Sequence, residues 1–224
     1  MKRDRGFTLI ELAVVVAIFG LLLTILVVPL STQFDQQRAA ETQKQLENVR
    51  EALIGFAIAN GRLPCPANAT IAAGTANAGT ENRVGAACAA AQGTLPWAAL
   101  GVPETDAWGR RFTYRITLTF ADDPAVGMQA SFLITDTADI TLTDGTGPIA
   151  SALPAMVVSH GKNGLGAYQT NGIQIAGPAG DESENSDNDV NFVSRPHAPD
   201  FDDQLAWVSS NVLKSRMVAS NRLP

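Results

Sequence analysis

The sequence has few of the residues that build common catalytic and metal centres. It contains two histidines and two cysteines in 224 residues, and their wide spacing excludes a usual zinc site. It has no Gly-x-Ser-x-Gly or similar nucleophile motif, so His160 and His197 are interpreted as loop residues and no enzymatic activity is predicted. Basic residues are in the minority and the formal net charge is −6, which disfavours a nucleic-acid partner.

The longest apolar run lies near the N-terminus. Residues 7–30 carry a single charge, on Glu11, and a helix of this length is about 36 Å long, enough to cross a bilayer. The net charge of +2 on residues 1–6 predicts a cytoplasmic N-terminus with the rest of the chain outside. A secretory signal is the alternative, but it would have a shorter apolar core and a small-residue cleavage site, which does not follow here.

Glu11 is unusual because it lies within this run. A charge inside a membrane span costs on the order of 2.5–3.5 kcal/mol, and such residues are often functional. Alternatively, Glu11 lies near the interface and is stabilised by the positive end of its helix.

The residues around Glu11 favour a functional role. The string RGFTLIEL at residues 5–12 resembles the processing site of type IV pilins and type II secretion pseudopilins. In that family a prepilin peptidase cleaves after the leader glycine, and the new first residue is N-methylated. The resemblance implies that residues 1–6 are a leader peptide, that cleavage separates Gly6 from Phe7, and that Phe7 is methylated.

The resemblance also implies a function. The protein would be a structural subunit of a type IV pilus or a type II secretion pseudopilus, and its partners would be other pilin or pseudopilin subunits. It would cross the inner membrane once with its head in the periplasm, and then enter a filament at the cell surface. Glu11 would pair with the Phe7 amine, either between neighbouring subunits, where it would set their register, or within one subunit. A mature length of 218 residues favours a minor subunit.

Two other functions are considered. One is a membrane-anchored extracytoplasmic binding protein that does not polymerise. The other is an anchored enzyme, for which the sequence offers no site. A simple anchor requires neither a peptidase site nor a carboxylate in its span, so both features favour the structural subunit.

The expected fold is α+β and pilin-like, with a long N-terminal helix packed on an antiparallel sheet. Residues 7–30 form the membrane or filament-core part of the helix, and residues 31–224 form the head. Small and apolar residues recur at spacings of three and four, which predicts an amphipathic helix that ends at Asn60-Gly61: Ala39, Thr42, Leu46, Val49, Leu53 and Phe56. Residues 61–93 form a disulfide loop, and residues 94–224 form the sheet and an acidic loop.

Alternating and apolar runs predict the strands, of which the clearest is Arg111–Phe120 with its apolar residues on one face. Further strands are expected at Ser131–Thr135, Asp139–Thr143, Ala155–Ser159 and Val190–Ser194. Residues 201–218 are expected to be strand-to-helix or wholly helical. Trp97 and Trp108 are assigned to the core. The Asp-x-Trp-Gly turn at 106–109 and the Ser-x-Gly-x-x-Gly turn at 159–164 resemble pseudopilin heads.

Cys65 and Cys88 flank a stretch of Ala, Gly, Asn and Thr that would not stay ordered alone. The predicted topology places both cysteines in an oxidising compartment, so we expect a disulfide between them. Such a bond would stabilise the fold by roughly 3 kcal/mol in the chain-entropy model. The alternative is two reduced, buried cysteines.

Residues 181–189 contain five carboxylates and two amides. Hard oxygen ligands at this density suit Ca²⁺, although the spacing does not fit an EF-hand. The string DNDV at 187–190 is similar to the calcium loop of major pseudopilins. The resemblance implies Asp187 and Asp189 as ligands, with Asp181, Glu184 and Asn185 as further candidates. The alternative is a solvated acidic loop.

Overall fold

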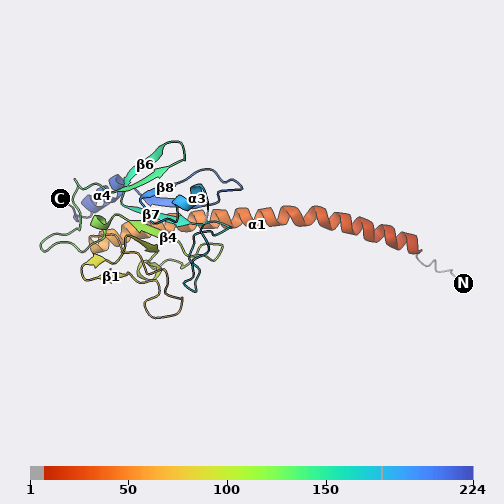
Figure 1. Ribbon diagram of the computed structural model, residues 1–224, viewed down its shortest axis with the longest axis horizontal. Coiled ribbons are helices and arrows are strands. Elements are labelled where there is room, and N and C mark those ends of the chain that lie inside the picture. The colour runs from red at the N-terminus through yellow and green to blue at the C-terminus, as the bar shows by residue number, and fades with distance from the viewer. Residues whose placement is uncertain (1–7, 178, 224) are drawn as a thin grey trace. The chain divides into compact units, whose positions relative to one another are not determined.

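The computed structural model describes residues 8–177 and 179–223, with the backbone alone for residues 22–31 (Figure 1). The chain divides into two compact units, Met1–Ala40 and Glu41–Pro224. The helix α1 (Leu9–Asn60) contributes residues to both units. Among the residues whose side chains are described, no helical stretch combines the length and the apolar character that a membrane crossing requires.

Within the second unit, α1 presents one buried stripe. Leu46, Val49 and Leu53 have no exposed surface, as the spacing of three and four predicts. The helix ends at Asn60, and Gly61 adopts a positive φ of 75°. A Cβ at Gly61 would lie 2.2 Å from the carbonyl oxygen of Gln129, so this helix end requires glycine for both its conformation and its close packing.

A four-stranded antiparallel sheet forms the centre of the second unit. Its order is β3 (Gln92–Thr94), β4 (Thr113–Ile116), β7 (Ala155–Ser159) and β9 (Gln204–Val208). One face packs on α1 and on the C-terminal helix α4 (Ser210–Ala219) through a core that we call the helix-side core. It includes Leu46, Val49, Leu53, Phe112, Tyr114, Ile116, Val157, Val208 and Leu213.

A second core, which we call the distal core, covers the other face of the sheet. Its residues are Ile140, Leu142, Leu153, Met156, Val158, Phe192, Val193, Phe201 and Leu205. Ala155 and Val157 of β7 belong to the helix-side core, whereas Met156 and Val158 belong to the distal core. Every residue of β7 is therefore buried, which explains why this strand is apolar on both faces.

The distal core is closed by a three-stranded sheet of order β6 (Pro148–Leu153), β5 (Ile140–Thr143) and β8 (Asn191–Val193). Strands β5 and β6 are antiparallel, but β5 and β8 are parallel. Shorter elements complete the unit: the hairpin β1 (Arg83–Val84) and β2 (Ala87–Cys88), the helices α2 (Trp97–Leu100) and α3 (Asp181–Glu184), and a 3-10 turn at Leu118–Phe120.

The α+β class and several elements are confirmed. The predicted strands at 139–143, 155–159 and 190–194 contain β5, β7 and β8, and the strand-to-helix form of residues 201–218 is β9 followed by α4. The sheets are antiparallel except for the β5–β8 pair, which the sequence analysis did not anticipate. Two parallel strands need a long connection, and β5 and β8 are separated by β6, β7 and residues 181–189.

Two strand predictions need correction. Residues 131–135 form turns, in which Phe132 packs on Phe120 at 4.5 Å between ring centroids and the Leu133 amide donates to the Asp136 carboxylate. The predicted strand Arg111–Phe120 is shorter, because it ends at Ile116 and then turns. The polar face of β4 is also buried, since Arg111, Thr113 and Arg115 are at most 9% exposed.

Three aromatic or imidazole side chains differ from expectation. Trp97 and Trp108 are half-buried and lie outside both cores, because Trp97 begins α2 and stacks on the Arg111 guanidinium at 4.6 Å, and Trp108 lies in the turn before β4. His160 is not a loop residue in the ordinary sense, since its side chain is fully buried at the end of β7. His197 is exposed in a loop, as predicted.

Candidate functional site

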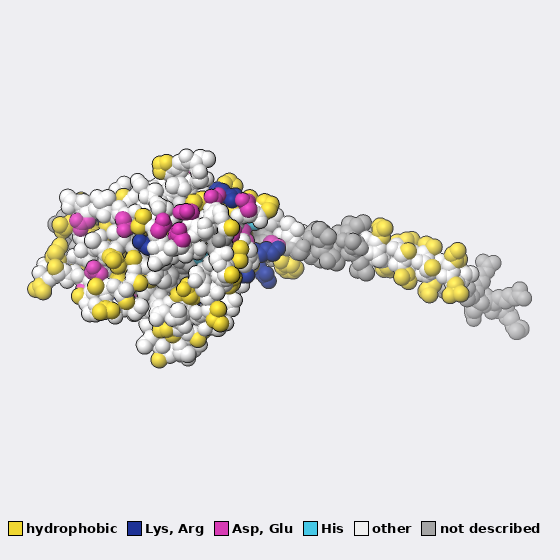
Figure 2. All heavy atoms as spheres, viewed as in Figure 1, with side chains coloured by type: hydrophobic (Ala, Val, Ile, Leu, Met, Phe, Trp, Pro, Cys, Tyr) yellow, Lys and Arg dark blue, Asp and Glu magenta, His cyan; other side chains and the backbone are white. Residues whose placement is uncertain are grey.

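The described N-terminal part of α1 is an exposed apolar helix with one carboxylate. All of residues 8–21 are exposed, and Leu9, Ile10 and Leu12 are among the large apolar side chains in this part (Figure 2). Glu11 lies in the first turn, where its carboxylate accepts hydrogen bonds from the amide and the hydroxyl of Thr8, both at 2.9 Å. The Thr8 hydroxyl in turn accepts from the Glu11 amide at 3.3 Å. This reciprocal pair is a capping box, which fixes where the helix begins. Gly6 and Phe7 lie outside the described residues.

Cys65 and Cys88 form a disulfide with a Cα–Cα distance of 5.3 Å. An ionic network holds the enclosed loop to the rest of the unit: Arg62 contacts Glu81 at 2.6 Å, and Asp123 at 3.0 Å. The Cys65 amide also donates to Glu81 at 2.7 Å. The loop has few large apolar residues, and these covalent and charged contacts hold it in place.

The two turn motifs that resemble pseudopilin heads are in direct contact. The Asp106 carboxylate accepts a hydrogen bond from the Ser159 hydroxyl at 2.6 Å and from the Trp108 and Arg110 amides at 3.0 and 2.9 Å. Burial is the main cause of a raised Asp106 pKa, and these hydrogen bonds oppose it. Because the Thr42 hydroxyl accepts from the adjacent Ala107 amide at 3.2 Å, the turn also fastens α1 to the sheet.

The acidic segment, residues 181–189, does not gather all the predicted calcium ligands. Carboxylate oxygens of Glu184, Asp187 and Asp189 lie within 4.8 Å of one another, and we call these residues the outer carboxylate cluster. Partial burial raises the pKa of Glu184, with further contributions from Asp187 and Asp189. Asp181 instead pairs with Arg195 at 2.6 Å. Calcium binding by this segment stays a prediction.

The fifth predicted ligand, Asn185, is buried and points away from the outer cluster. Its amide nitrogen donates to the Val193 carbonyl at 3.0 Å and to the Asp203 carboxylate at 2.8 Å. Its amide oxygen accepts from the Val193 amide at 2.9 Å. Asn185 thus joins the acidic segment to β8 and to the residue before β9.

A second group of acids, which the sequence analysis did not identify, joins Glu182 of this segment to two aspartates that precede β9. Carboxylate oxygens of Glu182, Asp202 and Asp203 lie within 4.8 Å of one another, and we call these residues the buried carboxylate cluster. Burial raises the pKa of Asp203 to about 8, while it lowers that of the adjacent His160 to about 4. The sequence signal was the Asp202-Asp203 pair after Phe201, which local acid density did not single out.

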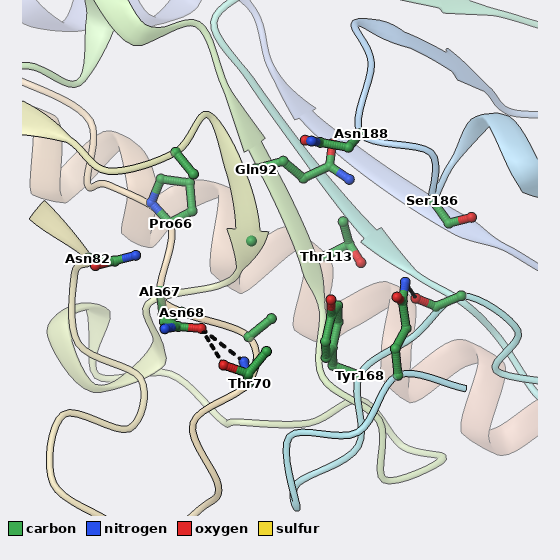
Figure 3. A pocket seen from close by; sticks show the side chains of 15 residues that line it. Pro66, Ala67, Asn68, Thr70, Asn82, Gln92, Thr113, Tyr168, Ser186 and Asn188 are labelled. Carbon is green, nitrogen blue, oxygen red and sulfur yellow. Dashed lines mark hydrogen bonds between the residues drawn. The ribbon is translucent and has the colours of Figure 1, made fainter. Parts of the chain in front are cut away.

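A polar pocket of about 350 Å³ opens beside the disulfide loop (Figure 3). Its lining comes from the loop after Cys65, from β3, from the segment around Tyr168 and from the acidic segment, and it contains no charged residue. Asn68 is held by hydrogen bonds from the Thr70 amide and hydroxyl at 3.0 and 2.9 Å. The Gln92 Oε1 atom is buried and has no hydrogen-bond partner among the described residues. The pocket suits a neutral, hydrogen-bonding ligand.

Comparison with known proteins identifies the N-terminal segment. Residues 1–27 match the family described as the prokaryotic N-terminal methylation motif, which is the signature of type IV pilins and pseudopilins. Proteins with this motif are structural rather than enzymatic. The motif implies processing by prepilin peptidase and association with other pilin subunits. It also implies a protein that is anchored in a membrane and then assembled at the surface. No curated protein and no solved structure matches the chain.

Proposed function

We propose that this protein is a minor structural subunit of a type IV pilus or a type II secretion pseudopilus. The observation that carries the proposal is the methylation motif at residues 1–27, a segment that also contains the proposed peptidase site, an apolar run and Glu11. In this proposal residues 7–30 anchor the protein in the inner membrane, the head lies in the periplasm, and the same helix later packs in the filament.

The exposed surface of α1 supports this role. Leu9 is 89% exposed and Ile10 is 73% exposed, and apolar side chains recur around the helix as far as Leu21. Soluble chains rarely leave a contiguous apolar surface of this kind uncovered. Lipid and neighbouring helices of other subunits are the two environments that would cover it, and a pilin-like subunit uses both in turn.

Processing is the first test. The protein extracted from membranes of cells with an active prepilin peptidase should lack residues 1–6 and carry one added methyl group on Phe7, as measured by intact mass and N-terminal peptide sequencing. A Gly6→Val variant should keep Met1, because the leader of this family ends in glycine. A wild-type chain that retains Met1 in such cells would contradict the proposal.

Assembly is the second test. Glu11→Ala should leave cleavage and membrane insertion intact, because the span becomes more apolar. It should lower incorporation into sheared filaments, because the Phe7 amine would be left without its partner. Glu47→Ala, which removes an exposed carboxylate 4.0 Å from Arg50 on the same helix, is the control and should assemble normally. Assembly of Glu11→Ala at the wild-type level would exclude the proposed amine–carboxylate pair.

The polar pocket favours a second candidate, an anchored binding protein that does not polymerise. The unsatisfied Gln92 Oε1 and the uncharged lining are the observations behind it. This candidate predicts a membrane protein that stays monomeric after chemical cross-linking in intact cells. A ladder of cross-linked species that disappears in Glu11→Ala would favour the filament subunit.

A further inference from the structure

The polar pocket beside the disulfide loop collects carboxamide side chains from several separate parts of the chain. They are Asn68, Asn82, Gln92, Gln174 and Asn188. Figure 3 shows Asn68 and Asn82 at one side of the pocket, and Gln92 and Asn188 at another. Each carboxamide carries both donors and an acceptor, so this lining matches a ligand whose groups also donate and accept hydrogen bonds.

The rest of the lining narrows the class of ligand. None of the described residues that line the pocket is charged, so it offers no counter-ion to a phosphate, sulfate or carboxylate. The apolar members are all small: Pro66, Ala67, Ala69 and Ala90. They form no deep apolar pocket of the kind that anchors a peptide side chain. Tyr168 adds one aromatic ring with a polar tip. The lining therefore favours a neutral ligand rich in hydroxyl groups.

One of these carboxamides has an acceptor that the protein leaves unpaired. Gln92 Oε1 is buried and accepts no hydrogen bond from the described residues. Arg115, the residue opposite Gln92 on β4, donates instead to the Asn188 carbonyl at 3.0 Å. A buried acceptor without a partner is costly, and native structures usually supply one. A ligand hydroxyl in the pocket would pair with Gln92.

The walls of the pocket are held by contacts that do not use these carboxamides. The backbones of Ala67 and Thr94 exchange hydrogen bonds of 2.8 and 3.1 Å. The buried Arg111 guanidinium donates to the carbonyls of Ala69 and Thr170 at 3.0 and 3.1 Å, and so fixes two of the framing loops together. A pocket that is formed before binding loses little conformational freedom when its ligand enters.

A second cavity of about 260 Å³ adjoins the first, because Asn68 and Asn82 line both. It also contains Glu81 and Arg83, whose charged groups lie 3.7 Å apart and neutralise each other. A chain-like ligand would extend from the first cavity past the two asparagines into the second.

We propose that the head binds a neutral oligosaccharide, with one sugar ring in the larger cavity and the chain continuing past Asn68 and Asn82. The larger cavity, at about 350 Å³, is within the range of about 300–1,000 Å³ that is typical of small-ligand sites. Sugar hydroxyls both donate and accept hydrogen bonds, as the carboxamides do. The proposal names a ligand for the binding role considered above, and it rests on that role of the pocket and not on filament assembly.

The test uses the full chain, purified in a detergent that carries no sugar. An array of neutral, sialylated and sulfated glycans is screened, and the tightest neutral glycan is then titrated by calorimetry. Neutral glycans should bind more tightly than charged ones, because the described lining has no cation to receive an acid. A tetrasaccharide should bind more tightly than its monosaccharide, because it reaches both cavities.

Two variants and a matched control locate the site. Gln92→Leu should weaken binding at least about fivefold, because it removes a donor and an acceptor from the pocket. Ala90→Phe changes an exposed residue of the lining and should block the pocket without breaking any side-chain hydrogen bond. Gln129→Leu removes an exposed carboxamide that lines neither cavity, and it should bind as the wild type does.

Thermal unfolding separates loss of binding from loss of folding. Without glycan, Gln92→Leu should unfold no earlier than the wild type, because Gln92 Oε1 makes no hydrogen bond that the change would break. The tightest neutral glycan should raise the unfolding temperature of the wild type and of Gln129→Leu, but not that of Ala90→Phe.

Several outcomes would overturn the proposal. A folded wild type that binds no neutral glycan at millimolar concentration is one of them. Binding that survives in both Gln92→Leu and Ala90→Phe, binding restricted to charged glycans, or equal affinity for a monosaccharide and its tetrasaccharide are the others. Glu11→Ala should bind the glycan normally even if it does not assemble, so failure of the binding proposal is distinguishable from failure of the filament proposal.

Discussion

Arg111 is expected to be one of the most sensitive residues of the head. Its side chain has no exposed surface, and its Nε and Nη2 atoms contact Glu104 Oε1 at 2.9 and 2.8 Å. It also donates to the carbonyls of Ala69, Ile71 and Thr170 at 3.0, 2.8 and 3.1 Å. One guanidinium thus fastens two loops to the segment that leads into β4.

Arg111→Met keeps much of the side-chain volume but removes every one of these donors. It leaves a carboxylate without its cation and three carbonyls without their donor. Loss of one partner of a buried, hydrogen-bonded charge pair typically costs about 3–5 kcal/mol. Because Glu104 is partly exposed, with 25% of its side-chain surface accessible, we expect the lower half of that range.

Urea unfolding of the detergent-solubilised chain measures this change. All three tryptophans, Trp97, Trp108 and Trp207, lie in the second unit, so their fluorescence follows the head alone. With a slope of about 2 kcal/mol per molar urea, the midpoint should fall by about 1.5–2 M. Glu104→Gln in the Arg111→Met background should recover part of the loss, because it removes the stranded charge.

The control is Arg50→Met on α1. Arg50 lies 3.7 Å from Glu51, but its side chain is 40% exposed, so its removal should cost less than about 1 kcal/mol. If the midpoints of Arg111→Met and Arg50→Met coincide, the network around Arg111 does not hold the loops as described.

The remaining predictions concern covalent and backbone constraints. A Cys65→Ala/Cys88→Ala double variant should lose roughly 3 kcal/mol of unfolding free energy, and wild-type protein unfolded in reductant should show the same loss. An equal midpoint with and without reductant would contradict the stabilising role. Gly161→Ala should destabilise the head strongly, because its φ is 55° and the new Cβ would lie 2.4 Å from Asp202 Oδ1. Gly74→Ala has a φ of 75° but no atom within 4 Å, so it isolates the backbone strain and should cost less; equal losses would remove the argument from contact.

Residue spacing within short segments predicted the long helix and several of the strands. The helix stripe through Leu46, Val49 and Leu53, and the runs that became β5 and β7, follow from residue spacing alone. The processing motif is also local, because a peptidase reads a short continuous string. The strand predicted at residues 131–135 was wrong, because the apolar run there makes single contacts, such as Phe132 on Phe120, and pairs with no described strand.

The buried polar groups could not be predicted in the same way. Alternation over Arg111–Phe120 separated an apolar face from a polar one, but it did not indicate that Arg111 is buried against the carbonyls of distant loops. The search for metal ligands likewise followed the density of acids along the chain. That reasoning did not anticipate that Glu182, Asp202 and Asp203 meet in space, because they come from two separate segments of the chain. Residues that meet only through the topology of two sheets leave no periodic signal in the sequence.

One helix with two compositions connects this fold to the proposed function. In the second unit, the apolar residues of α1 form a stripe that the head covers, and polar residues occupy the other positions. From Leu9 to Leu21 the side chains are apolar around the whole helix, apart from Glu11. All of these residues are exposed. Covering such surface would contribute a free energy of about 25 cal/mol for each Å² removed from water. The head can therefore fold around its own half of α1, and in the proposed function lipid or other subunits would cover the apolar half. A subunit that moves from a membrane to a filament requires this division.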